Sequence, residues 1–169
     1  DIEIEDIAHG LSFLARWNGQ TVGDYPFSVA QHSLLVENIF SMQFPDMDNP
    51  SKLFALLHDS AEYVIGDMIS PIKSHLGAEY EELDENLTTA ICMRFNIPTK
   101  KIETIKKRVK IADKKAAWLE AINLAGFSQR DADRIFGKQK EIEGFESSLL
   151  PEAPFIVRKN FVNRFNELY

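Results

Sequence analysis

Apolar residues recur at three- and four-residue spacings along most of this chain, which is the period of amphipathic α-helices. The first such stretch predicts a helix over about residues 4–17, whose apolar face comprises Ile4, Ile7, Ala8, Leu11, Leu14 and Ala15. Residues 18–26 follow as a loop rich in turn formers. Ser28 is a suitable N-cap for a second helix that extends to about Gln43, and residues 44–50 form the next loop.

The same period predicts the elements of the rest of the chain. They cover about residues 51–66, 78–95, 99–126, 129–137 and 156–168. In the second of these, the expected buried stripe comprises Tyr80, Leu83, Leu87, Ile91 and Cys92. No alternating strand pattern and no internal repeat is evident. The sequence therefore predicts an all-α, single-domain helical bundle with its site between helices.

Composition narrows the classes of partner. The net charge of −7 disfavours a polymeric nucleic acid, and the eight basic residues of the stretch 100–115 fit a solvated helix face. Cys92 is the single cysteine, so no disulfide framework exists and a reducing compartment is the simplest interpretation. No apolar run approaches the roughly 18–20 residues that span a bilayer. We therefore expect a soluble, cytoplasmic protein with no membrane partner.

Candidate chemistry is concentrated around His58. Asp59 follows it directly, Glu62 lies one helical turn later and Asp67 comes just after Gly66. An acidic surface patch is the alternative, but the negative end of a helix dipole disfavours carboxylates there. A divalent cation would relieve that conflict. Imidazole and carboxylate ligands suit Co, Mn, Zn, Ni or Fe better than Mg alone.

Further metal ligands must come from other helices. His32 lies in the first turn of the second predicted helix. Asp113 interrupts a stretch of apolar and basic residues, where it can bind a metal or, equally well, pair with a neighbouring lysine. His9 and His75 have no comparable neighbours, so we expect them to be structural or surface residues.

These residues carry a resemblance to a known family. The pattern of His32, His58-Asp59 and Asp113 resembles the H…HD…D signature of HD-domain metal-dependent phosphohydrolases. Residues 58–73 resemble the H-D-x-x-E-x-x-x-G-D-x-x-x-P-x-K block of bacterial 5′-deoxynucleotidases, and Arg16-Trp17 matches that group's R-W pair. The segments at 5–12, 25–32 and 109–113 resemble the compact branch that includes phage dATP triphosphohydrolases. The similarity covers residues 4 to about 120, and the helical tail at about 128–169 adds little.

The resemblance implies a set of site residues. It makes His32, His58, Asp59 and Asp113 the metal ligands, and Glu62 and Asp67 the catalytic groups. Arg16, Lys73 and Lys110 are the expected cations for phosphate oxygens. Trp17 either packs in the core or forms the wall that rejects a ribose 2′-hydroxyl.

The expected substrate is a small deoxynucleotide, and the expected reaction is removal of phosphate from a monophosphate or of triphosphate from a dNTP such as dATP. The loop between Trp17 and His32 departs from that of the nucleotidases, which leaves the base and the phosphate count open. The alternatives are an HD hydrolase of an alarmone or cyclic nucleotide, and a non-catalytic nucleotide sensor. Because related enzymes are commonly oligomers, we expect a homo-oligomer.

Overall fold

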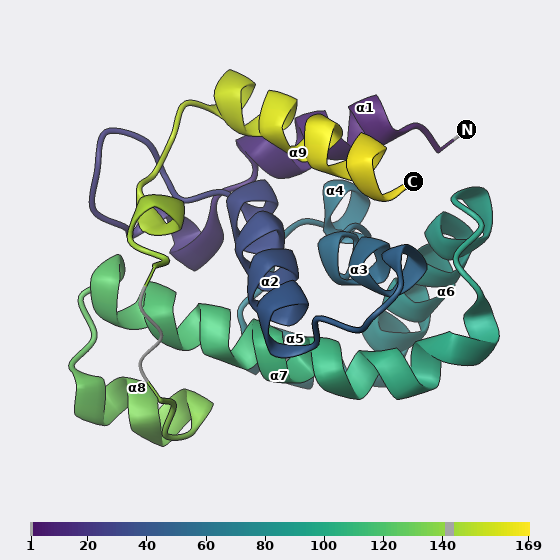
Figure 1. Ribbon diagram of the computed structural model, residues 1–169. Coiled ribbons are helices and arrows are strands. Elements are labelled where there is room, and N and C mark those ends of the chain that lie inside the picture. Colours follow the sequence, from purple (N-terminus) through teal and green to yellow (C-terminus); the bar gives the residue numbers. More distant parts are fainter. Residues whose placement is uncertain (1, 141–143) are drawn as a thin grey trace.

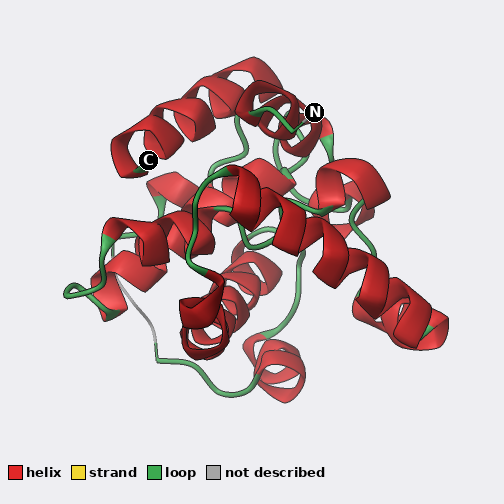
Figure 2. Cartoon of the chain, turned by 90° about the vertical axis from the view of Figure 1, so that its right-hand side faces the viewer, coloured by secondary structure: helices red, strands yellow, loops and turns green. Residues whose placement is uncertain are grey.

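The computed structural model describes residues 2–140 and 144–169 (Figure 1). Across these residues the chain is built of helices and loops, and an isolated antiparallel bridge joins Ala15 to Ser28 (Figure 2). The prediction of an all-α protein is thereby confirmed. No helix of the described residues is long and apolar enough to cross a bilayer.

The elements follow one another with short connections. In chain order they are α1 (Ile4–Phe13), the 3₁₀ turn η1 (Arg16–Gly19), α2 (Val29–Gln43), α3 (Asn49–Leu56), α4 (Glu62–Ile65), α5 (Ser70–Leu76), α6 (Ala78–Arg94), α7 (Thr99–Asn123), α8 (Gln129–Phe136), the 3₁₀ turn η2 (Ser147–Leu149) and α9 (Pro154–Leu168). Of the tail predicted at 128–169, residues 141–143 lie outside the described residues.

Local capping signals set several of these boundaries. The Ser28 side chain accepts a hydrogen bond from the backbone N–H of Gln31, which confirms it as the N-cap of α2. Asp48 accepts from the N–H of Ser51, and Pro50 occupies the first turn, so α3 starts two residues before the predicted position.

The predicted first helix is wrong at its end. It stops at Phe13 because Leu14 and Ala15 adopt extended backbone, where the Leu14 carbonyl accepts from the N–H of Val29. Trp17 and Asn18 then take left-handed backbone, with φ of 56° and 51°. Long-range pairing therefore overrides the local helical pattern and turns the chain sharply before α2.

The predicted helix over 51–66 is also wrong, because it is two helices separated by a turn at 57–61. Gly66 does end the second piece, with a positive φ of 80° that favours glycine. The helix α5 was not predicted. The stripe predicted for α6 is wrong at Leu83, which is 48% exposed, since α6 buries only its ends against the rest of the protein.

The core is one contiguous cluster of buried side chains drawn from α1, α2, α3, α6, α7, α8 and α9. Helix α2 lies at the centre, with α7 running past its lower part and α1 and α9 above it (Figure 1). The apolar positions that face inward on α2 are buried: Val29, Ala30, Leu35, Val36, Ile39 and Phe40. This packing brings the start of α2, the α3–α4 turn and the middle of α7 together.

Candidate metal centre

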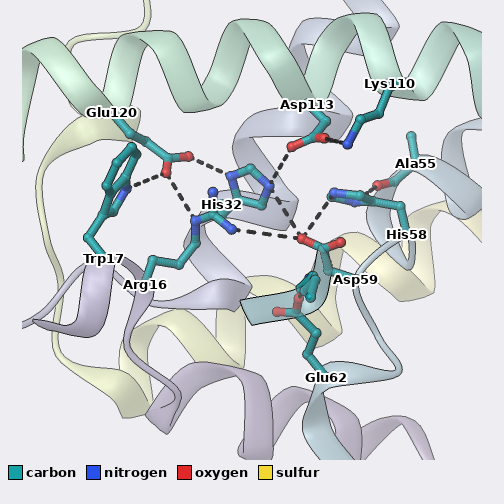
Figure 3. A network of polar contacts seen from close by, with 11 residues as sticks. Arg16, Trp17, His32, Ala55, His58, Asp59, Glu62, Lys110, Asp113 and Glu120 are labelled. Carbon is teal, nitrogen blue, oxygen red and sulfur yellow. Dashed lines mark hydrogen bonds and ion pairs between the residues drawn. The ribbon is translucent and has the colours of Figure 1, made fainter. Parts of the chain in front are cut away.

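The four residues predicted as metal ligands come from three separate segments of the chain. His32 lies in the first turn of α2, His58 and Asp59 lie in the α3–α4 turn, and Asp113 lies in the middle of α7. Figure 3 shows Asp59 and Asp113 on either side of the Nε2 edge of His32, with His58 beside Asp59. His32 Nε2 lies 3.5 Å from Asp59 Oδ2 and 3.3 Å from Asp113 Oδ1, and His58 Nε2 lies 3.3 Å from Asp59 Oδ2.

Each imidazole is oriented through its other ring nitrogen. His58 Nδ1 lies 2.9 Å from the carbonyl oxygen of Ala55. Because a carbonyl can only accept, Nδ1 carries a proton, and Nε2 is the nitrogen that faces the cluster. His32 Nδ1 lies 2.5 Å from a carboxylate oxygen of Glu120, which favours the same tautomer. Both rings therefore direct an Nε2 atom toward Asp59.

These two nitrogen atoms carry the strongest evidence for a ligand site. His32 Nε2 and His58 Nε2 are buried, and neither has a hydrogen-bond partner among the described residues. Ligand atoms of His32, His58 and Asp59 all lie within 4.8 Å of one another. Asp113 joins them through His32, while its second oxygen accepts from Lys110 Nζ at 2.8 Å. Asp113 therefore pairs with Lys110 and approaches His32 at the same time.

The electrostatics favour a positive charge at this point. Burial and the charge of Arg16 lower the pKa of His32. Glu120 and Asp113 outweigh them and raise it to about 9. Burial would raise the pKa of Asp59, yet His58 and His32 hold it well below its usual value. The pKa of Asp113 is likewise lowered despite burial, chiefly by His32. The cluster thus stabilises a cation between ionised carboxylates.

Sequence reasoning missed Glu120, which is completely buried on α7. Besides His32, it accepts hydrogen bonds from Arg16 Nε at 3.0 Å and from Trp17 Nε1 at 2.9 Å (Figure 3). Burial would raise its pKa, but Arg16 and His32 lower it to about 2. Its spacing was a signal, because seven residues after Asp113 is two helical turns on, and so the same face of α7.

The predicted catalytic carboxylates lie beside this cluster. Glu62 begins α4 and is 2% exposed; Lys73 Nζ donates to its Oε1 at 2.9 Å, and its Oε2 has no partner among the described residues. Burial, with the charges of Asp59 and Asp67, raises the pKa of Glu62 to about 8, although Lys73 opposes this. Burial also raises the pKa of Asp67, which follows Gly66.

The expected arrangement of Glu62 over His58 on one helix is wrong. Residues 57–61 form a turn, and the N–H of Glu62 donates to the carbonyl of Asp59 as the next helix begins. The turn therefore replaces the continuous helix that was expected, and it still places Glu62 close to the cluster. Glu62 is brought near Asp59 while His58 remains free to orient on Ala55.

A cavity of about 400 Å³ opens at the cluster, between α6 and α7. It is lined by Phe54, His58, Asp59, Asp84, Glu85, Thr88, Lys106, Lys107, Val109, Lys110 and Asp113. Lys110 is therefore placed where a ligand in the cavity would meet it. Lys73 approaches from α5, where it binds Glu62.

Arg16 and Trp17 are not among the lining residues of that cavity. The guanidinium of Arg16 is bound to Glu120, and its Nη1 lies 4.0 Å from Asp59 Oδ2. The Trp17 ring packs against Phe127 and Phe136, with centroid distances of 5.6 and 6.0 Å. Both residues border the cluster from the side opposite Lys110 (Figure 3).

The other two histidines lie on the surface, as expected from their sequence context. His9 is exposed on α1, and its ring contacts that of Phe13 in a tilted arrangement at a centroid distance of 4.7 Å. His75 is exposed near the end of α5.

A comparison with known proteins identifies a relative of this chain. No family model matches the sequence. An uncharacterized protein of Rhodobacter capsulatus is 52% identical over 170 residues, a match that spans 99% of this chain and 86% of that protein. At this identity and coverage, the chain belongs to the same protein family as the Rhodobacter capsulatus protein.

Proposed function

We propose that this protein is a divalent-metal-dependent phosphohydrolase acting on deoxynucleotides. It would remove the 5′-phosphate from a deoxynucleoside monophosphate or triphosphate from a dNTP. The observation that carries the proposal is the pair of buried imidazole nitrogens, His32 Nε2 and His58 Nε2, which lack hydrogen-bond partners among the described residues and lie against Asp59.

The donor set fits a divalent cation. The donors are two imidazole nitrogens, from His32 and His58, and two carboxylates, from Asp59 and Asp113. These are the ligand types of Mn, Fe, Co, Ni and Zn sites, while Mg takes mainly the carboxylates. Such a cation supplies Lewis acidity, which activates water and neutralises charge on a phosphate oxygen. Glu120 behind His32 is the kind of carboxylate that orients a ligating imidazole.

Glu62 is suited to accept a proton from the attacking water. One of its oxygens is fixed by Lys73, and Oε2 remains free of partners among the described residues. The raised pKa of Glu62 lies near neutrality, where a general base is most effective. Asp67, whose pKa is also raised, is the candidate to protonate the leaving oxygen.

Cations for the phosphate surround the cluster. Lys110 lies on the cavity wall beside Asp113 and is exposed, so it can reach a phosphate oxygen. Arg16 approaches Asp59 from the opposite side, and Lys73 approaches with Glu62. Three cations from three segments would hold the non-bridging oxygens while the reacting phosphorus is attacked.

The test is a substrate panel with the purified protein. The protein is assayed with Mn²⁺, Co²⁺, Mg²⁺ or Zn²⁺ against ribo- and deoxynucleotide mono- and triphosphates, with phosphate, pyrophosphate and triphosphate scored separately. Asp59→Asn, purified in parallel, controls for contaminating phosphatases. Metal-dependent release from deoxynucleotides by the unaltered protein alone supports the proposal.

Other outcomes would replace the proposal. Hydrolysis restricted to an alarmone or a cyclic nucleotide, added to the same panel, would keep the metal chemistry and change the substrate class. Nucleotide binding by calorimetry without turnover under every metal would identify a sensor. Neither binding nor turnover would leave the deoxynucleotide assignment wrong.

A further inference from the structure

Glu120 joins two parts of the site that are separate in function. One of its oxygens faces the metal-ligand candidate His32, and the other faces the substrate-binding candidates Arg16 and Trp17. We infer that Glu120 is a positioning residue that couples metal binding at His32 to the placement of Arg16 and Trp17. This inference rests on the proposed function for the roles of those residues.

The contacts on both sides of Glu120 meet a single carboxylate. Glu120 is completely buried, so no water competes for its oxygens. Oε1 lies 2.5 Å from His32 Nδ1, while Oε2 accepts from Arg16 Nε at 3.0 Å and Trp17 Nε1 at 2.9 Å. The two oxygens belong to one planar carboxylate. A shift or change of charge at one oxygen is therefore felt at the other.

The segment that Glu120 holds is strained and needs support. Trp17 and Asn18 have φ of 56° and 51°, a left-handed backbone that L-residues other than Asn and Asp seldom adopt. The Trp17 ring leans on Phe127 and Phe136, but its polar edge is fixed by Glu120. The carboxylate thus helps to keep the turn at 16–19 in the conformation that presents Arg16 to Asp59.

A cation on His32 Nε2 would act on this turn through the imidazole. A cation that replaced the proton on Nε2 would change the donor strength of Nδ1–H, and with it the share of the carboxylate's charge that rests on Oε1. The hydrogen bond from the Trp17 indole to Oε2 would change in turn. In the reverse direction, fixing Arg16 and Trp17 on Glu120 fixes the ring that must bind the metal, as linkage requires.

The chain contains a built-in internal control. It has two tryptophans, and therefore two indole N–H signals in a ¹H–¹⁵N spectrum. Trp17 Nε1 donates to Glu120, whereas Trp118 Nε1 donates to Asp133 at 2.7 Å. Trp17→Phe removes one signal and so assigns both. The indole of Trp17 makes no contact with a metal-ligand candidate in the described structure.

The experiment is a Zn²⁺ titration of the metal-free protein, followed by calorimetry and by the two indole signals. Zn²⁺ is diamagnetic, so it does not broaden them. We expect the Trp17 signal to move in step with the calorimetric isotherm, and the Trp118 signal to move much less. Glu120→Gln should weaken Zn²⁺ binding about 10–100-fold, because one end of the amide cannot accept a hydrogen bond. It should also abolish the Trp17 response.

The matched control is Glu103→Gln, which alters an exposed carboxylate on the same helix and should leave both readouts unchanged. Zn²⁺ binding with an unmoved Trp17 signal, or unchanged affinity in Glu120→Gln, overturns the coupling and leaves the proposed function standing. Absence of Zn²⁺ binding by the unaltered protein overturns the metal site itself, and the coupling with it. The unaltered protein supplies the Trp17 readout even where Glu120→Gln fails to fold.

Discussion

The ammonium group of Lys73 lies 2.9 Å from Oε1 of Glu62, so a cation from α5 fixes the carboxylate that begins α4. Glu62 is 2% exposed, and it lies close enough to Asp59 and Asp67 for their charges to raise its pKa. Lys73 opposes that effect. The pair therefore sets how readily Glu62 can take up a proton.

The first prediction concerns Glu62 itself. Glu62→Gln keeps the shape of the side chain and an acceptor for Lys73 but removes the base, so kcat should fall by about 10²–10⁴. Metal content should remain that of the unaltered protein, because Glu62 is not among the candidate ligands. Steady-state kinetics and metal analysis of the same preparation measure both. Normal turnover would assign Glu62 a structural role, and Glu79→Gln, an exposed carboxylate on α6, is the matched control.

The second prediction concerns pH and Lys73. Since Lys73 lowers the pKa of Glu62, Lys73→Met should raise it. A rate that depends on ionised Glu62 is lost as pH falls through that pKa, so the acidic limb of the kcat profile should move to higher pH. The profile measured from pH 5 to 9 at saturating metal checks the sign. A limb that stays in place, or moves to lower pH, contradicts the role; His75→Asn on the same helix should leave it unchanged.

Much of the fold could be read from the sequence because its causes are local. Ser28 caps α2 through a bond to a residue three positions on, and the apolar positions of α2 repeat with the helical period. The end of α1 could not be read in this way. Leu14 pairs with Val29, and Trp17 bonds to Glu120, which lies 103 residues away in the sequence.

The candidate site likewise has residues that the sequence predicts and residues that only the packing reveals. His32, His58, Asp59 and Asp113 were identified as residue types in a pattern, and the fold brings them together. Glu120 was missed because an acidic residue on a long charged helix is usually solvated, and its burial follows from the packing of α2 and η1 against α7. The role of Glu120 can be recognised only in the structure, where His32, Arg16 and Trp17 all contact its carboxylate.

The third prediction tests the metal ligands. Asp59→Asn removes a charge that His32 and His58 both approach, and it should abolish tight divalent metal binding and nearly all hydrolysis. Elemental analysis and calorimetry with Mn²⁺ or Zn²⁺ provide the measurement. Asp46→Asn alters an exposed loop carboxylate by the same atoms and should retain both properties. Full occupancy with full activity in Asp59→Asn would show that the cluster is not the metal site.

The fourth prediction concerns stability away from the site. Arg164 on α9 donates to both oxygens of Glu37 on α2, each at 2.8 Å, and Glu37 is 3% exposed. Arg164→Met would leave this buried carboxylate with only the Ser41 hydroxyl among its described partners, and should lower the free energy of unfolding by about 2–4 kcal/mol. Urea denaturation measures the change.

Two further variants separate the ion pair from side-chain loss. Arg158→Met, on an exposed position of the same helix, should change the free energy of unfolding by less than about 0.5 kcal/mol. The double variant of Arg164→Met with Glu37→Leu should recover part of the loss, because no charge is then left buried. A single Arg164 variant as stable as the unaltered protein would mean that Glu37 is solvated or protonated at little cost.

The last prediction concerns the sugar. The Trp17 indole is fixed by Glu120 at its polar edge and by Phe127 and Phe136 at its ring, so its position beside Arg16 is rigid. A rigid apolar wall rejects an added hydroxyl by steric overlap and lost hydration, but by only about 10²-fold. We therefore expect dAMP and dATP to be favoured over AMP and ATP, with a clear preference that is not absolute.

Substitutions separate the wall from the phosphate contact. Trp17→Ala should raise ribonucleotide turnover relative to deoxyribonucleotide, because the space for a 2′-hydroxyl opens. Arg16→Ala should lower kcat/KM for ribonucleotides and deoxyribonucleotides alike, because Arg16 would bind the phosphate that both share. Trp118→Phe, which alters the second tryptophan, a buried residue far from Arg16 in the sequence, should leave the ratio unchanged. Equal rates of the unaltered protein on both sugars, or a Trp17→Ala variant that loses both activities in proportion, would assign Trp17 to packing alone. The ratio of kcat/KM values for dATP and ATP decides between these roles, because folding losses cancel in it.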